Sequence, residues 1–145
     1  MINQNKTYKT KQKEIILNYF KKFQNKHITV QDIYNYLKKE DNSVGITTIY
    51  RHLDKLVADK VIKKYILEGE MCAYFEYIGE SEKESIKFHL KCNKCNKLSH
   101  FKCSELNNLY IHFINEHHIN IDLSKTIYYG ICDKCNKENK ELKYV

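Results

Sequence analysis

The sequence predicts an α+β protein in two parts, an N-terminal winged-helix domain and a small C-terminal α/β domain that holds a metal. Apolar residues recur with helical spacing three times in the first 60 residues, and two β-prone runs follow them. Three helices and then a hairpin are the element order of a winged helix. The second half contains two Cys-x-x-Cys pairs, a pattern typical of structural zinc sites.

Two helices are expected before residue 40. The first is expected because apolar residues from Ile15 to Phe23 fall on one helical face, and Thr10 is a residue type that can cap its start. The second begins after Thr29, whose hydroxyl can cap the helix. Asp32, three residues later, can accept a hydrogen bond from the Thr29 N–H in return.

A third helix is expected from Ile46 to near Asp59. Short polar and cationic side chains should face outward from it, and these suit phosphates and base edges in a major groove. This outward set is Thr47, Thr48, Arg51, His52 and Lys55. Periodicity does not decide whether Tyr50 buries its ring or offers it to a thymine methyl. The DNA-binding candidates are therefore Thr47, Thr48, Tyr50, Arg51 and Lys55.

The charge distribution also favours nucleic acid as the partner. The chain carries a net charge of +7, with +8 on residues 1–64 and −1 on residues 65–145. A basic surface confined to one half is expected where phosphates are neutralised, although a generally lysine-rich composition would also produce it. The sequence shows no Gly-rich phosphate loop and no nucleophile elbow, so we expect no enzyme.

A hairpin and a hinge should follow the third helix. The hairpin strands are Val61–Leu67 and Met71–Tyr77, joined by a Gly-containing turn at residues 68–70. The polar residues 79–84 suggest a hinge, which divides the chain into a DNA-binding domain at 1–78 and a second domain at 85–145.

The second domain should form a small antiparallel sheet with one helix. Strands are expected from residue 86 to Cys92 and at 97–102, 119–123 and 126–131, with a one-sided helix from Leu106 to about His117. One helix cannot cover both faces of such a sheet, so we expect a second copy of the chain to cover it in a homodimer.

The two cysteine pairs predict a structural zinc site formed by Cys92, Cys95, Cys132 and Cys135. Four thiolates fill a tetrahedral shell, so the ion would stabilise the fold and catalyse nothing. Disulfides are the first alternative, and iron in the same cage of a rubredoxin-like electron carrier is the second. A zinc-ribbon module that binds RNA or protein is a further alternative for the function of the chain, with zinc still in the cluster.

We expect a cytoplasmic protein. The polar, lysine-rich start does not resemble an export signal, and no apolar run is long enough to span a membrane. Cysteine pairs in a reducing compartment more often hold metal than form disulfides.

Three stretches resemble the ferric uptake regulator (Fur) superfamily of metal-responsive repressors, over essentially the whole chain. They are His27–Tyr34, Gly45–Arg51, and His89–Cys92 together with both cysteine pairs. The resemblance implies that Tyr50 and Arg51 contact DNA, and that a dimer binds an inverted-repeat operator.

The resemblance also implies a second, regulatory metal that acts as corepressor. Matched residue by residue, its ligands are His27, Glu76, His89 and His100. Zinc is favoured over iron or manganese, and Cys72, Cys103 and His117 are possible additional metal ligands. A peroxide-sensing regulator of the same family is the alternative.

Three positions depart from the family pattern. Lys87 and Ser124 each occupy a position that is usually His, and His100 stands where an acid is common.

Overall fold

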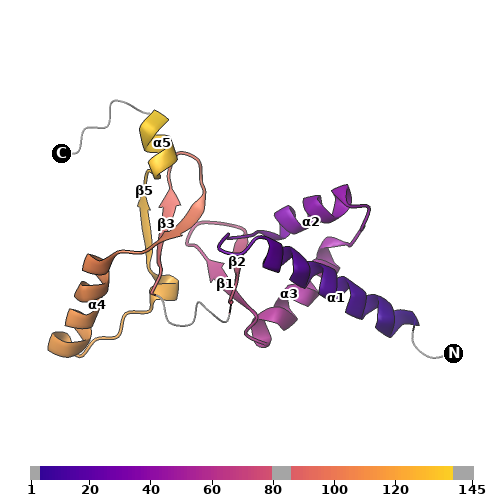
Figure 1. Ribbon diagram of the computed structural model, residues 1–145, viewed down its shortest axis with the longest axis horizontal. Helices are drawn as coiled ribbons and strands as arrows, with labels where there is room; N and C mark the ends of the chain where they lie inside the picture. Colours follow the sequence, from indigo (N-terminus) through magenta and orange to yellow (C-terminus); the bar gives the residue numbers. More distant parts are fainter. Residues whose placement is uncertain (1–3, 80–85, 139–145) are drawn as a thin grey trace. The chain divides into compact units, whose positions relative to one another are not determined.

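The computed structural model describes residues 4–79 and 86–138, and the chain divides into two compact units, residues 1–83 and 84–145 (Figure 1). The expected hinge lies outside the described residues except for Gly79. Within the described parts, no helix is both long and apolar enough to cross a membrane.

The N-terminal unit has the element order of a winged helix, as predicted. Its elements are α1 (Gln4–Lys22), α2 (Val30–Lys39), α3 (Ile46–Ala58), β1 (Ile62–Ile66) and β2 (Ala73–Tyr77). The two strands pair antiparallel, with Ile62 opposite Tyr77, and the turn between them contains Gly69 at a φ of 78°. Buried side chains of all five elements form one core, with Phe20, Ile33, Leu53 and Phe75 each at most 1% exposed.

The predicted second-helix cap is confirmed, whereas the predicted first-helix cap is wrong. The Thr29 hydroxyl accepts from the Asp32 N–H at 3.2 Å, and the Asp32 carboxylate accepts from the Thr29 N–H at 2.9 Å. Helix α1 instead begins at Gln4, so Thr10 lies inside it. Residues 4–9 carry no apolar stripe, so periodicity could not reveal this extra turn.

The described part of the C-terminal unit, residues 86–138, is a three-stranded sheet with two helices and one 3-10 turn. Its elements are β3 (Phe88–Cys92), β4 (Leu98–Phe101), α4 (Ser104–His117), η2 (Leu123–Lys125), β5 (Ile127–Gly130) and α5 (Asp133–Glu138). The strand order is β4-β3-β5. The expectation of an antiparallel sheet is wrong in part, because β5 pairs parallel to β3 while β4 pairs antiparallel to it (Figure 1). The long α4 connection returns the chain in the direction of β3.

One further local prediction fails in this unit, and one helix was missed. Residues 119–122 form no strand, and residues 123–125 form the η2 turn, capped by the Asp122 carboxylate, which accepts from the Ser124 N–H at 3.0 Å. Side-chain capping by Asp competes with strand pairing at such a position. Helix α5, which carries Cys135, was not predicted, because its six residues are too few for a periodicity signal.

The C-terminal unit leaves many large apolar side chains exposed. Only Tyr110 of α4 is buried, where its ring lies 5.4 Å from that of Phe88 in β3. Large apolar side chains from α4, its following loop and β5 are exposed, namely Leu109, Ile111, Ile114, Ile119, Ile121, Tyr128 and Tyr129. So many exposed apolar side chains in one small unit are compatible with a partner covering part of them.

Candidate metal centres and nucleic-acid interface

The four paired cysteines converge in the C-terminal unit. Cys92 is the last residue of β3, Cys95 follows in the adjoining turn, and Cys132 and Cys135 lie just before and within α5. Their four sulfur atoms all lie within 4.8 Å of one another. Sulfurs bound at about 2.3 Å to a tetrahedral zinc lie about 3.8 Å apart, so this donor set fits zinc with little rearrangement.

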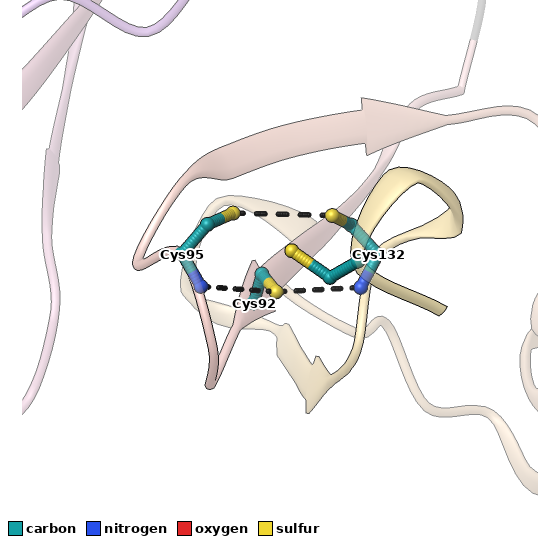
Figure 2. Close-up of side chains that lie close together, drawn as sticks. Cys92, Cys95 and Cys132 are labelled. Carbon is teal, nitrogen blue, oxygen red and sulfur yellow. Dashed lines mark hydrogen bonds between the residues drawn. The ribbon is translucent and has the colours of Figure 1, made fainter. Parts of the chain in front are cut away.

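Backbone hydrogen bonds pre-arrange this cluster (Figure 2). The N–H groups of Cys95 and Cys132 donate to Cys92 Sγ at 3.5 and 3.4 Å, and the Sγ atoms of Cys95 and Cys132 lie 3.9 Å apart. The Asn93 N–H also donates to the Gly130 carbonyl at 2.7 Å, which links the turn between Cys92 and Cys95 to β5. All six cysteines are free thiols, so the predicted alternative of disulfides is wrong for this structure.

The thiol groups of the cluster differ strongly in acidity. The N–H groups of Cys95 and then Cys132 lower the pKa of Cys92 to about 6, against the opposing effect of burial. Hydrogen bonding to Cys132, and then burial, raises the pKa of Cys135 to about 12. Four adjacent thiols cannot all ionise without a cation, so the metal-free cluster retains protons that a bound metal would displace.

One buried lysine stabilises the turn that contains Cys95, and it was not singled out from the sequence. Lys91 is 5% exposed, and its ammonium donates to the Asn96 carbonyl. The neighbouring His89 is 3% exposed, so β3 does not follow the simple alternation of buried and exposed residues that its sequence suggested. Both faces of this central strand are covered.

His27 and Glu76 lie together in the N-terminal unit. Ile28 and Phe75 form an antiparallel bridge, with two N–H···O bonds of 2.8 Å, and this register places His27 opposite Glu76. His27 Nε2 lies 3.4 Å from Glu76 Oε2, and both side chains are buried. The bridge explains why His27 and Glu76, which are 49 positions apart in the sequence, lie side by side as two potential metal ligands.

Tyr65 contacts both members of this pair, and its role was not predicted from the sequence. Its hydroxyl donates to Glu76 Oε2 at 3.2 Å, and its ring lies edge-on to the His27 ring with centroids 5.4 Å apart. The only sequence signal was its place on β1, two residues beyond the partner of Glu76 and therefore on the same face.

His89 and His100 form a second pair, within the C-terminal unit. They are directly opposite in the β3–β4 register, with ring centroids 6.4 Å apart. Each unit therefore contributes two of the four residues expected to bind a regulatory metal.

The three possible additional ligands do not form a group. Cys72 is exposed beside β2, and Cys103 and His117 lie at opposite ends of α4, whose 14 residues span about 20 Å. Among the described residues, none of the three belongs to a cluster of three or more metal-ligating side chains.

Most of the α3 side chains that we expected to contact DNA are exposed. Thr47, Arg51 and Lys55 are exposed, Thr48 is half-buried, and Tyr50 is 48% exposed. Tyr50 also lines a hollow of about 240 Å³ that includes Thr29 at the start of α2 and Cys72 of the wing. The Tyr50 ring is therefore not buried in the core, and its contact with DNA stays a prediction.

His52 is a correction to that surface. Its side chain was expected to face outward, but it is 6% exposed and belongs to the inner face of α3. Burial, and then the nearby Lys55 and Lys13, lower its pKa from 6.5. His52 is therefore a neutral core residue and contributes no cation to the helix surface near neutral pH.

A winged helix with exposed Arg51 and Lys55 on α3, followed by a unit with a four-cysteine cluster, is the arrangement expected of a DNA-binding metalloprotein. The comparison with known proteins narrows this class: residues 4–129 match the ferric uptake regulator family, and the chain belongs to that family. Members of this family are metal-responsive transcription regulators that bind DNA and act as dimers. The match covers both units, so neither an isolated zinc ribbon nor a rubredoxin-like carrier describes the chain.

Individual relatives agree with this assignment. The chain is 26% identical over 125 residues to a ferric uptake regulation protein of Neisseria gonorrhoeae, covering 86% of this chain and 83% of the relative. It is also 26% identical over 128 residues to a peroxide-responsive repressor of Staphylococcus aureus, covering 87% and 80%. The solved ferric uptake regulator of Francisella tularensis with iron has the same fold, with a TM-score of 0.68, 23% identity, and 94% of each chain covered.

Proposed function

We propose that this chain is a zinc-dependent transcriptional repressor that binds an inverted-repeat operator as a homodimer. The observation that carries the proposal is the His27–Glu76 pair, held at 3.4 Å by the bridge between the segment before α2 and the wing strand. A short polar contact between buried imidazole and carboxylate groups is a ready-made half of a metal site.

His89 and His100 supply the other half in this proposal. Together the four residues offer three imidazoles and one carboxylate, a donor set that suits zinc, iron or manganese. Three imidazoles against one carboxylate favour zinc or iron over manganese, and zinc is the ion that we propose. A bound ion would link the two pairs of ligands, and this link would change how the chain binds DNA.

The consequence is a change in the population of DNA-binding conformations. Linking the two pairs would favour one placement of each α3 helix relative to its dimer partner, and that placement must match the spacing of the operator half-sites. Within α3, Arg51 and Lys55 would contact phosphates or base edges, Tyr50 would contact bases, and Thr47 and Thr48 would contact the backbone.

The remaining parts have separate roles in this proposal. The cysteine cluster would hold one zinc ion permanently, because four thiolates leave no open position for water or substrate. The exposed apolar surface of α4, its following loop and β5 would be covered by a second copy of the chain. The support for this is that a three-stranded sheet with one long helix is too small to bury both of its faces by itself.

Metal analysis combined with DNA binding tests the proposal. DNA duplexes are first selected from a random library by the zinc-loaded protein, and affinity is then measured at buffered free zinc concentrations. At low free zinc we expect one retained and one exchangeable ion per chain. The His89→Ala and His100→Ala variants should keep the retained ion and lose zinc-dependent binding.

His118→Ala is the matched control, since His118 is exposed and belongs to neither pair. If the His89→Ala and His100→Ala variants bind the selected duplex as tightly as the parent at equal free zinc, the regulatory site is wrong. Parallel titrations with manganese, and with iron under anaerobic conditions, decide whether zinc is the preferred ion.

Peroxide sensing is the second candidate, favoured by the likeness to the staphylococcal peroxide-responsive repressor. It requires iron-driven oxidation of a histidine ligand, and Lys87 replaces one histidine that could serve. Mass spectrometry of the iron-loaded protein after peroxide treatment decides between them: one added oxygen atom on His27, His89 or His100 would favour peroxide sensing.

A further inference from the structure

A pair of histidines lies near the C-terminal end of α4, away from the cysteine cluster. His112 Nε2 and His117 Nε2 are 3.3 Å apart, and the two rings meet nearly edge-on, with centroids 5.1 Å apart and an interplanar angle of 76°. Both side chains are exposed, and the Phe113 ring lies beside each of them.

The separation of the two nitrogens matches a particular coordination geometry. Two imidazole nitrogens bound at about 2.0–2.1 Å to a tetrahedral ion lie about 3.3 Å apart. Adjacent ligands of a square-planar ion at similar bond lengths would lie only about 2.9 Å apart. The observed 3.3 Å therefore fits tetrahedral zinc better than square-planar copper or nickel.

The same separation also permits a hydrogen bond between one protonated and one unprotonated ring nitrogen. Such a bond between two exposed imidazoles contributes little, because water competes for both partners. A divalent ion would instead engage both nitrogens at once. His112 and His117 both lie within α4, of which His117 is the last residue.

We propose that His112 and His117 form an additional, solvent-open zinc site. Two imidazoles occupy two positions of the tetrahedral shell, and water occupies the other two. The ion is therefore exchangeable and bound more weakly than an ion in the four-thiolate cluster. This site is separate from the regulatory pairs, and the inference does not depend on them.

Zinc at this site would also stabilise the last turn of α4. The ion cross-links residues five positions apart, so fraying of the helix end would break a metal–nitrogen bond. The same helix carries the exposed Leu109, Ile111 and Ile114. Zinc binding would thereby order part of the surface that we expect a second copy to cover.

The test uses the full chain with its cysteine-bound zinc retained. Zinc uptake is measured by equilibrium dialysis and mass spectrometry, at free zinc from below to above the micromolar range. We compare the parent with the double variant His112→Gln/His117→Gln and with the control His118→Gln. Hydrogen exchange of the amides in the last turns of α4 is measured with and without zinc.

We expect the double variant to bind one fewer exchangeable zinc ion per chain at the upper end of the range. The control should match the parent. Zinc should slow amide exchange at the end of α4 in the parent and in the control, and leave it unchanged in the double variant. Equal uptake by parent and double variant overturns the proposal, as does an equal loss in the control. The retained cysteine-bound zinc reports that each variant is folded.

Discussion

The hydroxyl of Tyr65 offers a sharp test of how the N-terminal unit positions a metal ligand. Tyr65→Phe removes one oxygen atom and leaves the buried ring in place. The lost interaction is the 3.2 Å hydrogen bond from Tyr65 to Glu76 Oε2, the same oxygen that lies 3.4 Å from His27. Without it, the carboxylate loses the group that orients it toward the imidazole.

The size of the effect follows from the type of bond. A hydrogen bond to a charged group contributes about 1.5–3 kcal/mol, and groups that orient metal ligands typically change affinity by about 10–100-fold. A tenfold change corresponds to about 1.4 kcal/mol, so the two estimates agree. We expect Tyr65→Phe to weaken the exchangeable regulatory zinc by about 10–100-fold, with the cysteine-bound zinc unchanged.

A matched control is available on the neighbouring strand. Tyr74 lies opposite Tyr65 in the hairpin and donates its hydroxyl to Glu70 at 2.7 Å, outside the proposed site. Competition with a fluorescent zinc chelator measures the affinity of parent, Tyr65→Phe and Tyr74→Phe. If Tyr65→Phe and Tyr74→Phe bind zinc equally well, Tyr65 does not position Glu76 for the metal and the reasoning is refuted.

Three further predictions concern DNA binding, pH and helix capping. Arg51→Ala should weaken operator binding and, if Arg51 contacts a phosphate, lower the slope of log affinity against log salt by about one; Lys134→Ala, an exposed cation of the other unit, should leave the slope unchanged in fluorescence anisotropy titrations. His52 has a lowered pKa in the folded state, so the unfolded chain binds more protons as pH falls through 6.5, and stability should decrease toward acid; urea unfolding at several pH values should show a smaller decrease for His52→Gln. Thr29→Ala removes the hydroxyl half of the capping box and should lower the free energy of unfolding by about 0.5–2 kcal/mol in the same assay.

The sequence predicted those elements whose signals are local. Helix α3, the wing hairpin and the capping box at Thr29 all arise from periodicity or from side chains three residues apart, and all are confirmed. The cysteine cluster also followed from local spacing, because each two-residue gap turns both sulfurs the same way. Prediction from local sequence was wrong at Thr10, a capping residue type that lies inside α1. It was also wrong at residues 119–123, where a short alternation of apolar residues had no partner strand.

The sequence by itself therefore determined the order of the elements in the N-terminal unit, the inner face of most of its helices and the four cysteines of the cluster. Only the tertiary structure decided that β5 runs parallel to β3, that His52 is buried, and that Tyr65 completes the contact between His27 and Glu76. The physical reason is the range of the interactions. Caps and cysteine knuckles act within a few residues, whereas strand register and the pairing of distant side chains depend on segments that meet only when the core forms.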